Sequence, residues 1–154
     1  MDEPRFACDA MLGTLARWLR FAGFDASFDP SLPDPALAAA ARRDGRWLLT
    51  RDRLLAAAAG PRVVLLRCPD LAGQVGELRS RLALSADPDR AFTRCSRCNA
   101  LLEPVASDAV VREVPPYVAA HATRFVRCPG CRRIYWPGTH SERISLRVRA
   151  LFGP

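Results

Sequence analysis

The chain has 154 residues, of which 49% are hydrophobic and 25% are charged, a composition typical of one globular domain or of a domain with a small appendage. No apolar run approaches the roughly 18 residues that cross a bilayer, and the first ten residues lack the apolar core of a signal peptide, so we expect a cytoplasmic protein without a membrane partner. In that compartment the six cysteines are expected to be thiols or metal ligands rather than disulfides.

The net charge of +7 is distributed unevenly along the chain. Residues 1–89 contain twelve arginines and twelve acidic residues, whereas residues 90–154 contain eleven arginines and four acidic residues. This asymmetry indicates a basic second module whose partner is a polyanion. The alternative, that the chain's use of arginine reflects the base composition of the gene, does not explain where the excess lies.

Residues 1–84 show strands that alternate with helices. Short apolar runs predict strands over residues 5–8, 24–28, 46–50 and 62–67. Apolar residues at helical spacing predict helices that begin near residues 11, 34, 53 and 71. Strands that alternate with helices over short turns form βαβ units, so the sequence predicts an α/β domain with a mainly parallel sheet.

The pattern changes after residue 84. The segment 85–91 ("SADPDRA") reads as a linker, and cysteines, prolines and short strands follow it. A last helix is predicted from apolar residues at helical spacing, namely Ile144, Val148, Leu151 and Phe152. We therefore expect a domain over residues 1–84, a linker over 85–91 and a small module with a C-terminal helix over 92–154.

Two CxxC pairs in the second module predict a metal site. They place Cys95, Cys98, Cys128 and Cys131 so that each pair can direct two sulfurs at one ion. A redox function of the CxxC pairs is the alternative, but two pairs that flank a short-stranded, arginine-rich segment favour zinc. A site with four thiolates has no open position, so its zinc is expected to be structural.

Three carboxylates are expected at one edge of the sheet. Asp9 ends the first predicted strand, Asp52 ends the third, and Asp34 begins the second helix. Each of them taken alone is readily explained as a helix cap. Because the carboxyl ends of parallel strands share an edge, the three together predict a site for Mg²⁺ or Mn²⁺, which prefer oxygen ligands.

Four segments together resemble the Mut-seven-C RNase family, which consists of PIN-like ribonuclease domains with a C-terminal zinc ribbon. They are "FACDAMLGTLARWLRFAGFDA", "GRWLLTRDRLL", "RCSRCNALLEPV" and "CPGCRRIYWPGTH". The resemblance implies a PIN-like α/β/α fold, cleavage of RNA by a catalytic divalent cation, and acidic site positions at Asp9 and at Asp52 of the "TRD" motif. Asp34 matches the acidic position before the second helix, Asp29 competes with it, and Asp70 is a possible fourth carboxylate.

Several basic and aromatic residues are candidates to bind RNA, which we expect to be single-stranded. They are Arg17, Arg20, Arg51, Arg132, Arg133, Tyr135, Trp136 and His140. The alternatives are a solvated helix face for the first two arginines and packing against the ribbon or the main domain for the aromatics. The alternative function is a non-catalytic RNA-binding or adaptor module, and the sequence indicates no particular protein partner.

Overall fold

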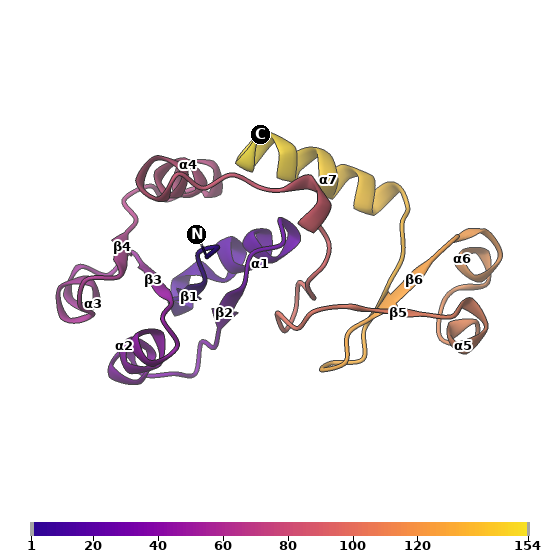
Figure 1. Ribbon diagram of the computed structural model, residues 1–154, viewed down its shortest axis with the longest axis horizontal. Coiled ribbons are helices and arrows are strands. Elements are labelled where there is room, and N and C mark those ends of the chain that lie inside the picture. The colour runs from indigo at the N-terminus through magenta and orange to yellow at the C-terminus, as the bar shows by residue number, and fades with distance from the viewer. Residues whose placement is uncertain (1, 154) are drawn as a thin grey trace.

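Four short strands form a parallel sheet in the order β2-β1-β3-β4 in the computed structural model, which describes residues 2–153. The strands are β1 (Phe6–Cys8), β2 (Ala26–Phe28), β3 (Trp47–Thr50) and β4 (Val63–Leu65). In the register, Phe6 pairs with Ala26 on one side and with Trp47 on the other. The parallel α/β arrangement predicted from the sequence is confirmed (Figure 1).

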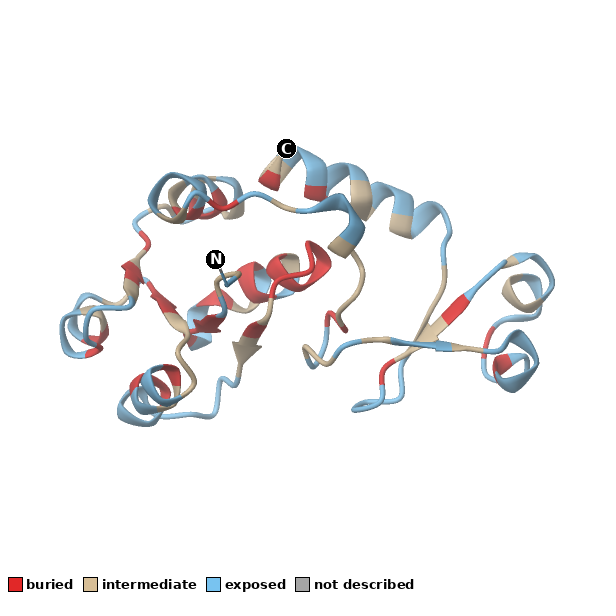
Figure 2. Cartoon of the chain, viewed as in Figure 1, coloured by how far each residue is buried: buried red, intermediate tan, exposed pale blue. Residues whose placement is uncertain are grey.

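Helices cover both faces of this sheet. The helices of the first 84 residues are α1 (Gly13–Phe21), α2 (Asp34–Arg43), α3 (Arg53–Ala58) and α4 (Leu71–Leu82), and a 3₁₀ turn, η1 (Ala10–Leu12), precedes α1. Side chains alternate between the faces, because Phe6 and Leu49 belong to the core beneath α1 and α4, whereas Ala7 and Leu48 belong to the core beneath α2 and α3. In Figure 2 buried residues accordingly appear in the strands and in the helices around them.

Apolar residues of η1 and α1 face the core, with one exception. Leu12, Leu15 and Leu19 are buried, but Met11 is 62% exposed and is not part of the core. The helix ends before Gly23, whose φ of +97° favours glycine. A Cβ at this position would lie 2.3 Å from the carbonyl oxygen of Arg90, so glycine is also required for the close approach of the linker.

The C-terminal helix α7 (Thr139–Phe152) packs against α4 and α1. Val148 and Phe152 are buried in the core beneath α1 and α4, and the ring of Phe152 lies 5.9 Å from that of Phe24. Figure 1 shows α7 running back from the ribbon over α1 and α4. The sequence predicted the apolar stripe, but such a stripe does not specify the surface that it contacts. We call β1–β4, α1–α4 and α7 the sheet module.

Residues 92–138 form the second module, here called the ribbon module. Strands β5 (Glu103–Val105), β6 (Phe125–Arg127) and β7 (Ile134–Tyr135) make an antiparallel sheet in that order. Two short helices, α5 (Ser107–Val110) and α6 (Pro116–His121), were not predicted and lie between β5 and β6. A turn η2 (Pro88–Arg90) lies in the linker. Among the helices of residues 2–153, none combines the length and apolarity needed to span a bilayer.

Candidate active site and metal centre

The carboxyl ends of the four parallel strands lie at one edge of the sheet, and an aspartate follows each strand. Asp9 comes directly after β1 and Asp29 directly after β2, while Asp52 and Asp70 lie in the connections from β3 to α3 and from β4 to α4. In open parallel sheets this edge is where ligands bind. The chain topology therefore brings the backbone of all four aspartates to the edge that favours ligand binding.

Asp9 is nearly buried, with 7% of its surface exposed, and both of its carboxylate oxygens accept hydrogen bonds. Oδ1 accepts from the backbone N–H of Ala10 at 2.7 Å, and Oδ2 accepts from the hydroxyl of Thr50 at 2.8 Å. These two bonds fix the orientation of the carboxylate. Each oxygen keeps a second lone pair with which it can bind a cation.

Thr50 links Asp9 to Asp52. Its fully buried hydroxyl donates to Asp9 and accepts a hydrogen bond of 2.9 Å from the backbone N–H of Asp52. The side chain of Asp52 caps α3, since its Oδ1 accepts from the N–H groups of Leu54 and Leu55 at 2.7 and 3.1 Å. We did not select Thr50 from the sequence, although a polar residue that ends an apolar strand just before an aspartate was a usable signal.

The other carboxylates lie on the surface. Asp29 accepts hydrogen bonds from the hydroxyl and the N–H of Ser31, which lower its pKa, and Asp70 caps α4 through the N–H of Gly73 at 2.9 Å. Asp34 is the first residue of α2, whose N-cap is Pro33, so the sequence prediction that Asp34 caps this helix is wrong. The side chain of Asp34 thus has no capping role to explain its position.

The carboxylates do not form a closed cluster. Within residues 2–153, only the four cysteines form a group of three or more His, Cys, Asp or Glu side chains whose ligand atoms lie within 4.8 Å of one another. Asp9 and Asp52 are joined through Thr50, and among the described residues no third carboxylate forms such a group with both of them.

The four cysteines of the ribbon module come from two knuckles with the same backbone hydrogen bonds. In the first (95–100), the N–H of Asn99 donates to the carbonyl of Cys95 at 2.9 Å, and the N–H of Cys95 donates to the carbonyl of Ala100 at 2.8 Å. In the second (128–133), the equivalent bonds join Cys128 to residues 132 and 133 at 3.0 and 2.9 Å. The fifth residue of each knuckle has a positive φ, +74° and +66°.

The two knuckles bring the four sulfurs together, all within 4.8 Å of one another. The Sγ atoms of Cys95 and Cys131 are 3.6 Å apart, and those of Cys98 and Cys128 are 3.2 Å apart. A zinc ion with bonds of about 2.3 Å to sulfur separates neighbouring sulfurs by about 3.8 Å. The four thiols therefore fit a metal such as zinc.

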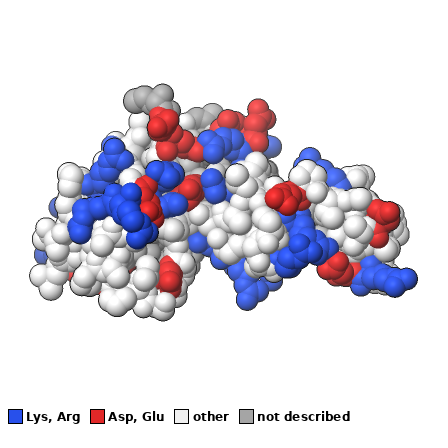
Figure 3. Space-filling model, turned by 60° about the horizontal axis from the view of Figure 1, so that its bottom comes forward, with Lys and Arg blue, Asp and Glu red and all other residues white. Residues whose placement is uncertain are grey.

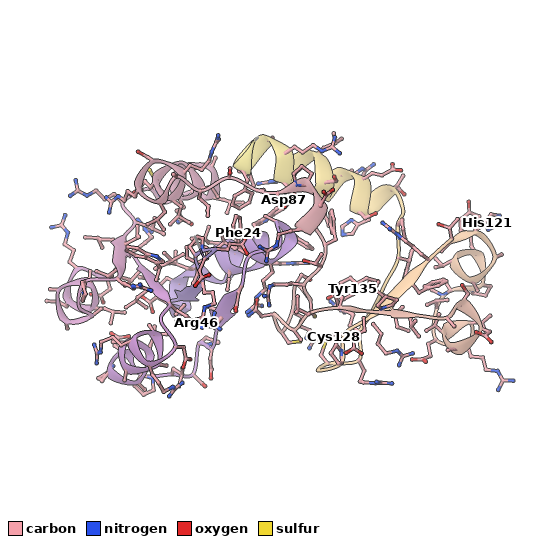
Figure 4. All side chains as sticks on the ribbon, in the orientation of Figure 1. Phe24, Arg46, Asp87, His121, Cys128 and Tyr135 are labelled. Carbon is pink, nitrogen blue, oxygen red and sulfur yellow. The ribbon has the colours of Figure 1, made fainter. Side chains whose placement is uncertain are left out.

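Tyr135 contacts this site directly. Burial by itself raises the pKa of the Cys95 thiol, but hydrogen bonds from the Tyr135 hydroxyl and from the N–H groups of Cys98 and Arg97 outweigh it and lower the pKa to about 6. The Tyr135 oxygen lies 3.1 Å from Sγ of Cys95, and Figure 4 shows the ring next to the knuckles. These bonds favour the thiolate, which is the form that binds zinc.

Three residues that we predicted to bind RNA have other roles in the structure. Arg20 is 4% exposed and donates to backbone carbonyls, so a solvated helix face is wrong for it as well. Tyr135 is held at the metal site, and Trp136 packs against the core of the ribbon module around Phe125. Trp136 thus packs against the ribbon, which was one of the alternatives for the aromatics.

The remaining predicted RNA ligands are exposed, namely Arg17, Arg51, Arg132, Arg133 and His140. The guanidinium of Arg17 lies over the ring of Phe21 at 5.5 Å from its centre. On the face drawn in Figure 3, arginines form several separate patches on both modules, with acidic side chains between them. The basic excess of the second half is therefore not gathered into one continuous patch on that face.

Comparison with known proteins gives one clear result. No curated protein and no solved structure matches the chain. The model of the Mut7-C RNAse domain family, however, matches residues 4–148, which is nearly the whole chain and includes the sheet edge, the linker and both knuckles. The chain therefore belongs to the Mut7-C RNAse domain family.

Proposed function

We propose that the chain is a metal-dependent ribonuclease of PIN-like fold that hydrolyses phosphodiester bonds in single-stranded RNA. The observation that carries this proposal is the array of Asp9, Thr50 and Asp52 at the carboxyl edge of the parallel sheet. Membership of a family of ribonuclease domains supports RNA as the substrate. A nearly buried carboxylate that a buried hydroxyl holds in place is more than a helix cap needs.

In this proposal the two aspartates are the principal ligands of a catalytic Mg²⁺ or Mn²⁺. Asp52 uses Oδ1 for both capping bonds, so Oδ2 is the oxygen that can turn to a cation without loss of the cap. Thr50 holds Asp9 at a fixed distance from the backbone of Asp52, so that both carboxylates can address one ion. When bound, such an ion activates a water molecule and stabilises negative charge on the phosphate.

A third carboxylate completes the site in this proposal, and there are three candidates for it. Strands β1 and β3, which precede Asp9 and Asp52, are neighbours at the centre of the sheet. Asp29 follows the outer strand next to β1, and Asp34 begins the helix after it, whereas Asp70 follows the outer strand next to β3. We propose Asp34, which caps nothing, as the third ligand, with Asp29 and Asp70 as its competitors.

We further propose that the cysteines hold a structural zinc and that the exposed arginines contribute affinity for RNA that does not depend on sequence. Arg132 and Arg133 belong to the second knuckle and are exposed, and Arg51 adjoins Asp52. Arginines that contact phosphates give binding that weakens as salt concentration rises.

The experiment measures cleavage of a fluorescent single-stranded RNA. Zinc-loaded protein is dialysed into buffer without divalent ions, and Mg²⁺ or Mn²⁺ is then added, because a strong chelator would also strip the cysteine site. We expect cleavage only with the added ion, and loss of cleavage in Asp9→Asn. Asp87→Asn is the matched control, because Asp87 caps η2 in the linker through the N–H of Asp89. RNA binding without cleavage under every ion would instead support the adaptor function.

A further inference from the structure

The first knuckle takes the place of a fifth strand beside β2. Strand β2 is an edge strand that pairs only with β1 among the described strands. On its outer side, the N–H of Ala26 donates to Oδ1 of Asn99 at 3.0 Å, and the carbonyl of Ala26 accepts from Nε of Arg20 at 2.8 Å. Two side chains therefore satisfy the backbone groups that an edge strand otherwise exposes.

Arg20 joins three elements through one guanidinium group. It projects from α1, binds Ala26 in β2, and donates from Nη1 to the carbonyls of Ser96 and Arg97 at 3.1 and 2.9 Å. Residues 96 and 97 lie between the first two cysteines of the metal site. Because Arg20 is 4% exposed, its charge depends on these carbonyl partners in place of water.

Asn99 belongs to the knuckle and to the sheet edge at the same time. Its φ of +74° is a conformation that asparagine adopts more readily than most residues, and its N–H closes the knuckle on Cys95. Besides its bond to Ala26, its side chain donates from Nδ2 to the carboxylate of Asp25 at 2.7 Å. Asp25 also forms a half-buried ion pair with Arg46, which Figure 4 labels beside the sheet.

The contact extends to the candidate active site. A cavity of about 400 Å³ lies between the sheet module and the knuckle. Its walls include Ser27, Phe28 and Asp29 from the end of β2, and Arg97 and Asn99 from the knuckle. The knuckle therefore forms a wall beside one of the strand-end aspartates.

We infer that Arg20 and Asn99 are positioning residues that couple metal binding at the four cysteines to the order of β2. Strand β2 has three residues, so the bonds to Ala26 are a large share of what holds its outer side. When the metal leaves, the knuckle loses its cross-link. Asn99, which binds Ala26, and the carbonyls of residues 96 and 97, which hold Arg20, then lose their fixed positions. Coupling between two sites is reciprocal, so breaking the bonds to β2 weakens metal binding by the same factor.

Hydrogen exchange and zinc affinity test this inference without RNA. In the wild-type protein, removal of zinc by a chelator is expected to speed amide exchange in residues 24–30 by about tenfold or more. Exchange in β4, the opposite edge strand, serves as the internal reference. Asn99→Gly keeps the positive φ but removes the side chain, so we expect rapid exchange in residues 24–30 even with zinc bound. Zinc competition assays are expected to show that Asn99→Gly binds zinc about five- to 150-fold more weakly than the wild type.

Arg20→Met gives a second test, with Arg17→Met as the matched control. The two arginines lie on the same helix, but Arg17 is exposed and Arg20 is buried against the knuckle. In amide exchange of residues 24–30 and in zinc affinity, we expect Arg17→Met to match the wild type. Arg20→Met is expected to match Asn99→Gly in both measurements. If Arg20→Met fails to fold, Asn99→Gly alone decides the question.

Two results would overturn the inference. One is exchange in residues 24–30 that is the same with and without zinc, and the other is wild-type zinc affinity in Asn99→Gly. The inference rests on the proposed function only in one respect, namely that Asp29, which follows β2, belongs to the candidate active site. A protein that shows the coupling but does not cleave RNA would refute the ribonuclease proposal and leave the coupling established.

Discussion

Replacing Thr50 by valine perturbs the centre of the proposed active site with little change of shape. Valine has nearly the same volume as threonine, but it can neither donate to Asp9 nor accept from the N–H of Asp52. The substitution therefore removes two hydrogen bonds of 2.8 and 2.9 Å at a fully buried position. It leaves both aspartates in place, so a loss of activity would report on their orientation.

The structure gives the size of the effect. An unsatisfied buried donor costs about 1–3 kcal/mol, and loss of a hydrogen bond to a charged group costs about 1.5–3 kcal/mol. Since the N–H of Asp52 is only partly buried, we take the lower part of the summed range, about 2.5–4 kcal/mol in all. For a protein of this length each kcal/mol lowers Tm by about 2–4 °C, so a decrease of about 5–15 °C is expected.

Thermal unfolding and RNA cleavage are measured on the same preparations, well below the Tm of each variant. A displacement of Asp9 by about 1 Å is enough to lower cleavage by about 10²-fold. Thr50→Ser is the control, because it keeps the hydroxyl and loses one methyl group, which costs about 1 kcal/mol. A Thr50→Val protein with the stability and cleavage rate of the wild type would refute the assignment of Thr50 as the link between the two aspartates.

Three further predictions concern the other sites. Purified protein is expected to contain about one zinc per chain, and metal analysis should show its loss in Cys98→Ser; full zinc retention in a double Cys98/Cys128 variant would contradict the site. Charge reversal of Arg132 and Arg133 should weaken RNA binding and reduce the slope of log affinity against log salt by about 1–2, whereas an unchanged slope would place the RNA elsewhere. Burial raises the pKa of Asp25, but hydrogen bonds from Arg46 and Asn99 outweigh it and lower the pKa. The contribution of the Asp25 carboxylate to the free energy of unfolding is therefore lost as the pH falls through this lowered pKa. In urea unfolding, the difference in free energy between the wild type and Asp25→Asn should therefore narrow below about pH 5, and a constant difference would contradict this.

Local patterns predicted much of the fold. The four strands, the helices between them and the apolar stripe of α7 all follow from spacing that each segment carries by itself. The spacing of the CxxC pairs likewise predicted that the four sulfurs meet, because each pair needs only its own turn and one partner.

Several of the errors concern contacts between distant segments. The sequence shows that Arg20 lies off the apolar stripe of its helix, and Arg20 was therefore predicted to bind RNA. The sequence does not show that the backbone carbonyls of residues 96 and 97 lie next to it and bind it. The destination of Val148 and Phe152 depends on a surface built from other elements. Thr50 was missed for the same reason, since its hydroxyl becomes significant only when β1 and β3 lie side by side.

The central claim is that Asp52 does more than cap α3, and Asp52→Asn tests it most directly. Asparagine caps helices about as well as aspartate, so the bonds from Leu54 and Leu55 should persist and the free energy of unfolding should change by less than about 1 kcal/mol. The negative charge is lost, and with it a ligand of the divalent cation. The decisive measurement is single-turnover cleavage of single-stranded RNA at saturating Mn²⁺, with Asp87→Asn, another cap, as the control.

We predict that Asp52→Asn lowers cleavage by about 10²-fold or more at nearly unchanged Tm, and that the double variant with Asp9→Asn is little worse than either single variant. The Asp87→Asn control should cleave like the wild type. An Asp52→Asn protein that cleaves RNA at the wild-type rate would return Asp52 to the role of a helix cap and contradict the proposed site.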